Sequence, residues 1–168
     1  MHIQCTKKLL DFLKPAVIEK NTNNDLHAWH ANYVNINRKK FLVLMNDLTR
    51  FCIILYGVKK SDFKDPLLML QKAILLSMTV EEFDQQIVLE YVNQIKEVTY
   101  SKTKDRKLVA QLNRAVADAW WYCVDHLYNQ LYQPDISSFL NNGYVGTNHW
   151  KEVHSPVDKM KEYLEMLK

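Results

Sequence analysis

The sequence predicts an α+β fold in which strands precede helices along the chain. Between positions 29 and 56, three short runs rich in Val, Ile, Phe and Tyr are separated by connections short enough for hairpins. From position 65 onward, apolar residues recur at helical spacing instead. This order favours an N-terminal antiparallel sheet of three to four strands packed against a C-terminal layer of three to four helices.

The chain of 168 residues is long enough for one domain with a sizeable core and short for two. We therefore expect a single domain over 1–168, strand-rich over 1–60 and helical over 65–140, with a C-terminal helix over 155–167. Apolar residues make up 48% and charged residues 24%, as in soluble globular proteins. No signal-peptide pattern or membrane-length apolar run is visible, so we expect a cytoplasmic protein with no membrane partner.

The charge and the cysteines limit the classes of function. A formal net charge of +3 permits an anionic partner without arguing for one. Cys5, Cys52 and Cys123 are far apart, lie beside apolar residues and form no metal or redox spacing. We expect three buried thiols, no metal site and no cofactor.

The N-terminal part contains the strand signals. Ile3–Cys5 can form a short strand, and Lys7–Leu13 can form a helical turn. The central strand candidates are Trp29–Ile36, Phe41–Met45 and Phe51–Tyr56. The second and third of these are almost continuously apolar, so we expect them to be covered on both faces.

Capping residues mark the helix starts. Asp65-Pro66 combines an N-cap residue with proline at the first helical position, and Asp105 can cap a long helix. Thr79–Glu82 has the form of a capping box, and Ser155-Pro156 precedes the last helix. Residues 141–155 are the only plausible flexible stretch.

A turn over Asn37–Lys40 would set the pairing of the first two central strands. Ile36 then faces Phe41, and His30 lies opposite Asp47. The next hairpin closes at the same edge of the sheet. The polar side chains gathered at that edge, beside Trp29, would be His30, Asn32, Asn46, Asp47 and Thr49.

Two interpretations of this polar cluster remain open. Asn, Asp and Thr at a turn commonly bond their own backbone, and one His–Asp pair is commonly structural. Alternatively, Asp47 fixes the tautomer of His30 and leaves its other nitrogen free for proton transfer, in a small hydrolase or nuclease-like enzyme. The ligand-binding side chains of such an enzyme would be Trp29, Asn32, Asn46, Thr49, Arg106 and Asn113, with Arg106 holding a phosphate. This hypothesis requires a pocket that touches His30, Asp47 and Asn113 together.

Basic residues gather at the opposite edge of the predicted sheet. Arg38, Lys39 and Lys40 lie in the first turn, and the third strand returns toward the same edge to end near Lys59 and Lys60. A charged turn is commonly only solvated. The alternative is a surface that contacts the phosphates of a nucleic acid.

Trp120-Trp121-Tyr122 is a dense aromatic block within the predicted long helix. Neighbours on a helix point about 100° apart, so the two tryptophans cannot face the same core. One of them can lie at an interface or under a loop. For the block as a whole we favour core packing over ligand stacking.

These segments together resemble a bacterial family of unknown function. The resemblance rests on Cys5–Leu10 (CTKKLL), Trp29–Asn32 (WHAN) and Asn46–Thr49 (NDLT), with a weaker match at Arg106 and Ala110–Asn113 (AQLN). The last segment has Ala and Gln where Gly and Ser are expected. This difference argues against another group approaching the helix backbone closely at that segment. The resemblance covers scattered pieces of residues 1–125 and implies no activity.

Our leading hypothesis for function is a cytosolic binding or regulatory module, phage- or plasmid-associated, that acts through protein contacts. The aromatic block and a C-terminal helix that could dock on a partner or on a second copy of the chain favour it. The hydrolase or nuclease-like enzyme and nucleic-acid binding through the basic turns are the alternatives.

Overall fold

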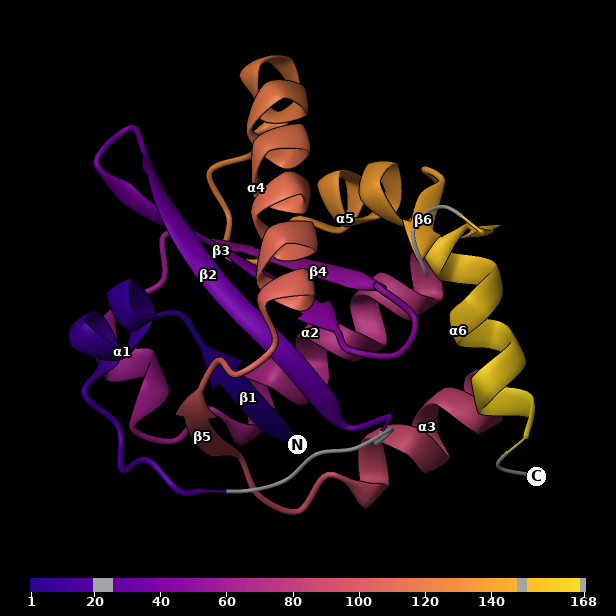
Figure 1. Cartoon of the computed structure of the whole chain (residues 1–168), viewed down its shortest axis with the longest axis horizontal. Coiled ribbons are helices and arrows are strands. Elements are labelled where there is room, and N and C mark those ends of the chain that lie inside the picture. Colours follow the sequence, from indigo (N-terminus) through magenta and orange to yellow (C-terminus); the bar gives the residue numbers. More distant parts are fainter. Residues whose placement is uncertain (20–25, 148–150, 167–168) are drawn as a thin grey trace.

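The computed structural model describes residues 1–19, 26–147 and 151–166 and has helices on both faces of a central sheet (Figure 1). This arrangement confirms the α+β class. The sheet has five strands in the order β4-β3-β2-β1-β5. They are β1 (His2–Cys5), β2 (Ala28–Ile36), β3 (Lys39–Asn46), β4 (Cys52–Tyr56) and β5 (Thr99–Lys102).

The sheet is mixed, whereas the sequence predicts an antiparallel one. β2, β3 and β4 form an antiparallel meander, but β1 lies between β2 and β5 and is parallel to both. A parallel pair needs a long crossover connection. The two partners of such a pair are therefore far apart in the sequence, and β5 has no local signal that would predict it.

The helices form two layers. They are α1 (Lys7–Leu13), α2 (Leu67–Val80), α3 (Gln85–Gln94), α4 (Arg106–His126), α5 (Pro134–Asn141) and α6 (Pro156–Glu165), with a short 3-10 helix η1 (Lys60–Phe63). Helices α1, α2, α3 and α6 contribute to the core on one face of the sheet, and α4 and α5 to the core on the other. The expectation of a single helical layer is therefore wrong.

Alternating side chains of the central strands explain why two layers are needed. In β3, Leu42 and Leu44 enter the first core, whereas Phe41, Val43 and Met45 enter the second. Since both faces of this strand are apolar, each face needs a cover. The prediction that the apolar strands are covered on both faces is confirmed.

The turn between β2 and β3 is tighter than the sequence predicts. Asn37 and Arg38 have φ values of 48° and 64°, as a two-residue type I′ turn requires. The two lysines that follow belong to β3, and His30 pairs with Met45 rather than with Asp47. The predicted register is thus wrong by two residues. A shift of two keeps each side chain on its expected face, because side chains alternate with a period of two.

Two predicted helix caps are confirmed and two are wrong. Asp65 does not cap α2, because the helix begins at Leu67 and Pro66 occupies the N-cap position. The Asp105 carboxylate accepts backbone hydrogen bonds at the start of α4, and the Ser155 hydroxyl accepts one at the start of α6. The capping box predicted over Thr79–Glu82 does not form, because α2 continues to Val80. Helix α3 begins instead after Asp84, whose carboxylate accepts hydrogen bonds from two backbone N–H groups.

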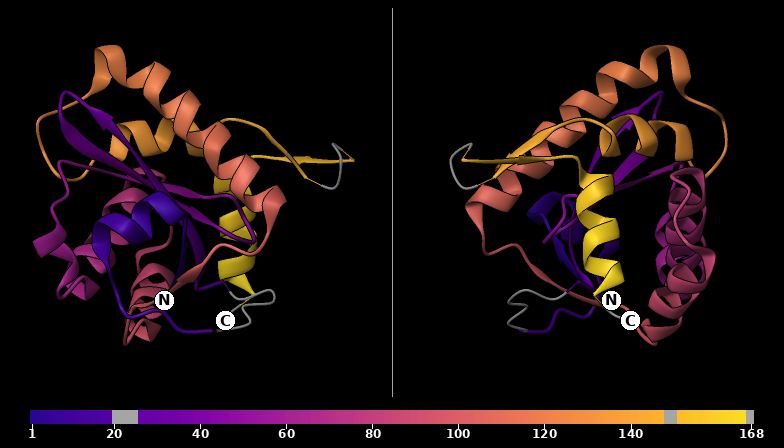
Figure 2. Two further views of the ribbon diagram at one scale, coloured as in Figure 1. Left: turned by 60° about the vertical axis from the view of Figure 1, so that its left-hand side comes forward. Right: turned by 90° about the vertical axis from the view of Figure 1, so that its right-hand side faces the viewer.

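Part of the stretch predicted to be flexible is ordered. Strands β6 (Val145–Thr147) and β7 (Glu152–His154) form a hairpin that projects from the body of the molecule (Figure 2). Its connection, residues 148–150, lies outside the described residues. The three cysteines are buried, as predicted. In the described ranges, no helix has both the length and the apolar character that a membrane span needs.

The positive φ of Arg38 yields a prediction about stability. Arg38→Gly should raise the free energy of unfolding by about 0.5–1 kcal/mol, because glycine adopts a left-handed conformation without the steric cost of a Cβ atom. Arg38→Val should lower it, since β-branched residues tolerate this conformation least. Urea denaturation of both variants would measure the effect, and a Val variant as stable as the Gly variant would contradict the type I′ turn.

Candidate functional site

Asp47, directly after β3, is the hub of a hydrogen-bonded cluster that spans three strands. Its Oδ1 lies 2.6 Å from Nδ1 of His30 on β2. Its Oδ2 accepts a hydrogen bond of 2.8 Å from the side-chain amide of Gln4 on β1. A carboxylate in this position favours the tautomer of His30 in which Nδ1 carries the proton. The second ring nitrogen, Nε2, is then an acceptor.

The ring of His30 is closed off from solvent. Its side chain is 0% exposed and that of Asp47 9% exposed. Nε2 is buried and has no hydrogen-bond partner among the described residues. Neither side chain lines any of the five main cavities of the described residues. The pair is thus within hydrogen-bond distance, as the enzyme hypothesis requires, but the pocket that should join it to Asn113 is not among those cavities.

Asn46 and Thr49 make the local turn contacts expected of their residue types. Oδ1 of Asn46 accepts hydrogen bonds of 3.1 Å from the backbone N–H groups of Leu48 and Thr49 and from the Thr49 hydroxyl. Trp29 is the cross-strand partner of Asn46, so it lies beside the polar cluster as predicted, and its side chain is 0% exposed in the first core.

A second polar contact joins the sheet to helix α4. Oδ1 of Asn32 accepts a hydrogen bond of 2.8 Å from the Thr6 hydroxyl, and its Nδ2 donates one of 3.0 Å to Oδ1 of Asn113. Arg106 is exposed at the first position of α4, about two turns before Asn113. The structure thus brings Asn32 and Asn113 together.

Arg50 and Gln111 belong to the site but are not predicted by the sequence pattern. The Arg50 guanidinium donates to the backbone oxygen of Asp47, and its Nε donates to Oε1 of Gln111 on α4 at 2.5 Å. Gln111 in turn donates to the backbone oxygen of Gly146 on β6 at 3.0 Å. Burial lowers the pKa of Arg50, and the carboxylates of Asp47 and Asp105 oppose that effect. The only local signal for Arg50 is its place directly after the NDLT segment.

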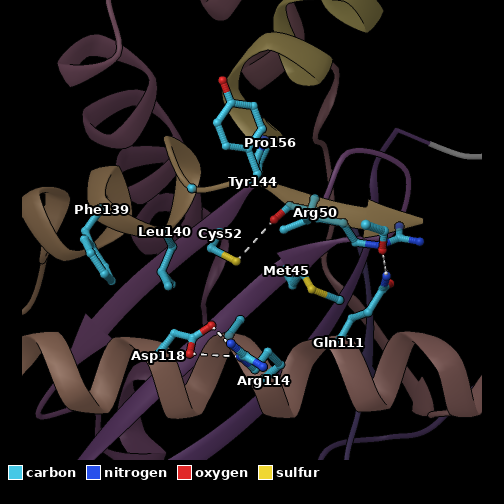
Figure 3. A pocket seen from close by; sticks show the side chains of 14 residues that line it. Met45, Arg50, Cys52, Gln111, Arg114, Asp118, Phe139, Leu140, Tyr144 and Pro156 are labelled. Atoms are coloured by element: carbon cyan, nitrogen blue, oxygen red, sulfur yellow. Dashed lines mark hydrogen bonds and ion pairs between the residues drawn. The ribbon is translucent and has the colours of Figure 1, made fainter. Parts of the chain in front are cut away.

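A pocket of about 260 Å³ lies beside Arg50, between α4, α5 and β6 (Figure 3). Apolar side chains, among them Met45 and Leu140, and the Cys52 thiol line it. Burial raises the pKa of that thiol to about 12, so it is protonated at neutral pH. Arg114 and Asp118, on the α4 wall of the pocket, form an ion pair with an N–O distance of 3.0 Å.

A separate concavity of about 750 Å³ lies at the opposite edge of the sheet. We call it the basic concavity. Its lining includes the five cations of the predicted nucleic-acid surface, Arg38, Lys39, Lys40, Lys59 and Lys60, together with Phe12 and Tyr56. Asp62 is the one carboxylate in this lining.

The tryptophans of α4 are exposed rather than packed in the core. The core-facing stripe of α4 is formed by Leu112, Val116, Ala119 and Cys123. Trp120 is 51% and Trp121 79% exposed, so the preference for core packing of these two residues is wrong. Beside them, the rings of Tyr122 and Phe139 stack with centroids 4.0 Å apart. We call Trp120, Trp121, Tyr122, Phe139 and Tyr144 the aromatic surface.

The contacts of Asp47 predict a loss of stability when they are broken. Asp47→Asn should lower the free energy of unfolding by about 1–3 kcal/mol, because the amide cannot accept from both His30 and Gln4, and buried polar groups lose a partner. Chemical denaturation at neutral pH measures this. Asp11→Asn is the matched control, since the Asp11 carboxylate is 65% exposed and should change stability little. Equal stability of the Asp47 variant and the wild type would show that the hub is dispensable.

Comparison with known proteins identifies a family but no individual relative. No match was found among curated proteins or among solved structures. One family model, that of a domain of unknown function (DUF6933), matches residues 2–159, which include the strands, helices α1 to α5 and the polar cluster described above. The chain therefore belongs to the DUF6933 family.

Proposed function

We propose that this protein is a binding module that docks a protein segment with apolar and cationic side chains on its aromatic surface. The observation that carries the proposal is the exposure of Trp121, at 79%, on a well-formed helix. Tryptophan is among the residues most enriched in the energetic hot spots of protein interfaces. An exposed cluster of large aromatic side chains is typical of interaction surfaces.

The position of Trp121 on α4 supports docking rather than a role in folding. At about 100° per residue, Trp121 lies on the side of the helix opposite the core-facing stripe, and Trp120 and Tyr122 flank it. No packing adjustment of this helix could bury Trp121 and keep Ala119 and Cys123 in the core. A partner could cover it without changing the fold.

Carboxylates around the aromatic surface indicate the charge of the partner. Asp118 and Asp125 lie three residues before and four residues after Trp121, on the same side of α4. Asp135 lines a shallow cavity together with Tyr122 and Phe139. Asp118 is paired with the nearby cation Arg114, so these two charges offset each other, and Asp125 and Asp135 carry the negative charge of this surface. A partner with Lys or Arg beside apolar groups complements this surface, and cations also bind the faces of aromatic rings.

A pair of designed peptides tests the proposal. An amphipathic helix of Leu and Lys should bind and shift the tryptophan emission, whereas its Leu and Glu counterpart should not. Trp121→Ala should weaken binding of the Leu/Lys peptide at least roughly tenfold, as expected on loss of a hot-spot residue. The matched control is Leu68→Ala, because Leu68 on α2 is a 73% exposed apolar residue away from this surface.

Three outcomes would overturn the proposal. Equal binding of the two peptides would show that the surface does not prefer a cationic partner. An unchanged affinity of the Trp121 variant would show that the aromatic surface is not the binding site. Sedimentation that shows a dimer dependent on Trp121 would make a second copy of the chain the occupant instead.

A second candidate function, binding of a nucleic-acid backbone, is favoured by the basic concavity. Its lining has five cations and one carboxylate, Asp62. The Asp62 carboxylate already accepts a hydrogen bond of 2.8 Å from the backbone N–H of Lys59. The Lys40 ammonium lies 5.1 Å from the ring centre of Phe12, and that of Lys39 lies 5.5 Å from that of Tyr56. Cations interleaved with aromatic rings suit a flexible, charged strand.

Salt dependence tests this second candidate. Binding of a single-stranded oligonucleotide should weaken as salt is raised, and the double variant Lys59→Gln/Lys60→Gln should reduce the logarithmic slope by about 0.7 for each phosphate that the protein no longer neutralises. Lys96→Gln, an exposed cation beyond the end of α3, is the control and should leave the slope unchanged. Absence of binding at low salt, or an unchanged slope in the double variant, would end the idea.

A further inference from the structure

We propose that the pocket between α4, α5 and β6 binds a small organic carboxylate, whose head group pairs with Arg50 and whose body lies against Met45, Cys52 and Leu140. The proposed site is separate from the basic concavity and does not depend on docking at the aromatic surface. Three features of the structure support it, namely the interior of the pocket, the state of its charges and the backbone of Arg50.

The interior of the pocket is apolar and enclosed by separate parts of the chain. Met45 and Cys52 come from the central strands, Ala115 from α4, Leu140 from α5 and Pro156 from α6. Its volume of about 260 Å³ is just below the roughly 300–1,000 Å³ typical of sites for drug-sized ligands. We therefore expect a ligand the size of a small metabolite, with an apolar body.

The two cations of the pocket differ in whether they form an ion pair with a carboxylate. Nε of Arg114 lies 3.0 Å from both oxygens of the Asp118 carboxylate, so that charge is offset within the protein. The acceptors of Arg50 among the described residues are neutral, a backbone oxygen and the Gln111 amide. The carboxylates of Asp47 and Asp105 are near enough to favour its charged form, but neither is seen to form an ion pair with the guanidinium, and the Asp47 carboxylate is bonded to His30 and Gln4.

Arg50 therefore contributes a partly buried positive charge, with no ion pair to a described residue, at one end of the pocket, beside Gln111 in Figure 3. Its guanidinium has further N–H groups for which no hydrogen bond to a described residue is seen. A planar carboxylate matches the fork of one guanidinium. One cation without an ion pair suits a head group with a single negative charge better than a phosphate with two.

The backbone at Arg50 supports a role for its side chain. Its φ of 65° lies in the left-handed region, where glycine has no steric cost and arginine does. A strained conformation at a non-glycine residue is typical of functional sites. The steric cost of an arginine in this conformation is explained if its guanidinium is needed to bind a ligand in the pocket.

The glycines of the chain provide a direct test by NMR. The sequence has three glycines. Gly143 and Gly146 line the pocket, and Gly57 lines the basic concavity instead. In a ¹H–¹⁵N spectrum, titration with 3-phenylpropionate should shift the amide signals of Gly143 and Gly146 to saturation and leave that of Gly57 in place. The neutral analogue 3-phenylpropanamide should bind at least tenfold more weakly.

Variants of the pocket extend the test. Arg50→Gln should weaken binding of 3-phenylpropionate at least tenfold, and Ala115→Trp, which fills the pocket but keeps Arg50, should abolish the glycine shifts. Lys96→Gln, an exposed cation beyond the end of α3 and outside the pocket lining, is the control that should bind like the wild type. The acid and the amide are compared on the wild-type protein, so that result does not depend on how well a variant folds.

Four results would overturn the proposal. They are no shift of Gly143 and Gly146 at millimolar 3-phenylpropionate, equal affinity for the acid and the amide, wild-type affinity in the Arg50→Gln variant, or shifts that persist in Ala115→Trp. A shift of Gly57 alone would place the anion in the basic concavity and would also refute the proposal.

Discussion

The carboxylate of Asp47 is the contact on which the arrangement of this edge of the sheet depends. Its two oxygens bond side chains from β1 and β2, and it stands directly after β3. A buried carboxylate is stable only when its oxygens are satisfied, so the starts of β1 and β2 and the end of β3 must be aligned at this edge. Asn46 closes the turn from the other side through its own side chain. Arg50 follows this turn with its backbone in a left-handed conformation. Its side chain donates a hydrogen bond to Gln111 on helix α4.

The position of helix α4 on the sheet depends on these contacts. Near its start it is held by two side-chain contacts, Gln111 to Arg50 and Asn113 to Asn32. Further along, its apolar stripe packs on the second core of the sheet. Because the inward side of a helix is set by that stripe, the orientation of Trp121 away from the protein follows from Ala119 and Cys123. The aromatic surface is therefore a consequence of how α4 is anchored.

The sequence predicts the features that depend on local chemistry. Asp105 and Ser155 cap helices as their residue types imply, and the apolar central strands are covered on both faces. Contacts between distant segments could not be foreseen. β5 pairs with β1, which lies almost a hundred residues earlier in the chain, and Gln4 is brought near Asp47 by the parallel pairing of β1 with β2. The hairpin register was missed because Asn-Arg, unlike Asn-Gly, is not a strong signal for a two-residue turn. The pocket also depends on contacts between distant segments, since its walls come from strands and helices far apart in the chain.

The pocket and the aromatic surface share side chains, which links the two proposed binding events. Phe139 and Tyr144 line the pocket and also belong to the aromatic surface. Tyr144 is 78% exposed, so a docked protein segment would contact the wall of the pocket. A ligand that changes the position of these rings changes the free energy of docking, and by thermodynamic linkage a docked segment changes the affinity for the ligand by the same factor. On this geometry, a carboxylate in the pocket would act as an effector of protein binding, whereas the basic concavity, which shares no lining residue with the pocket, would be independent of it.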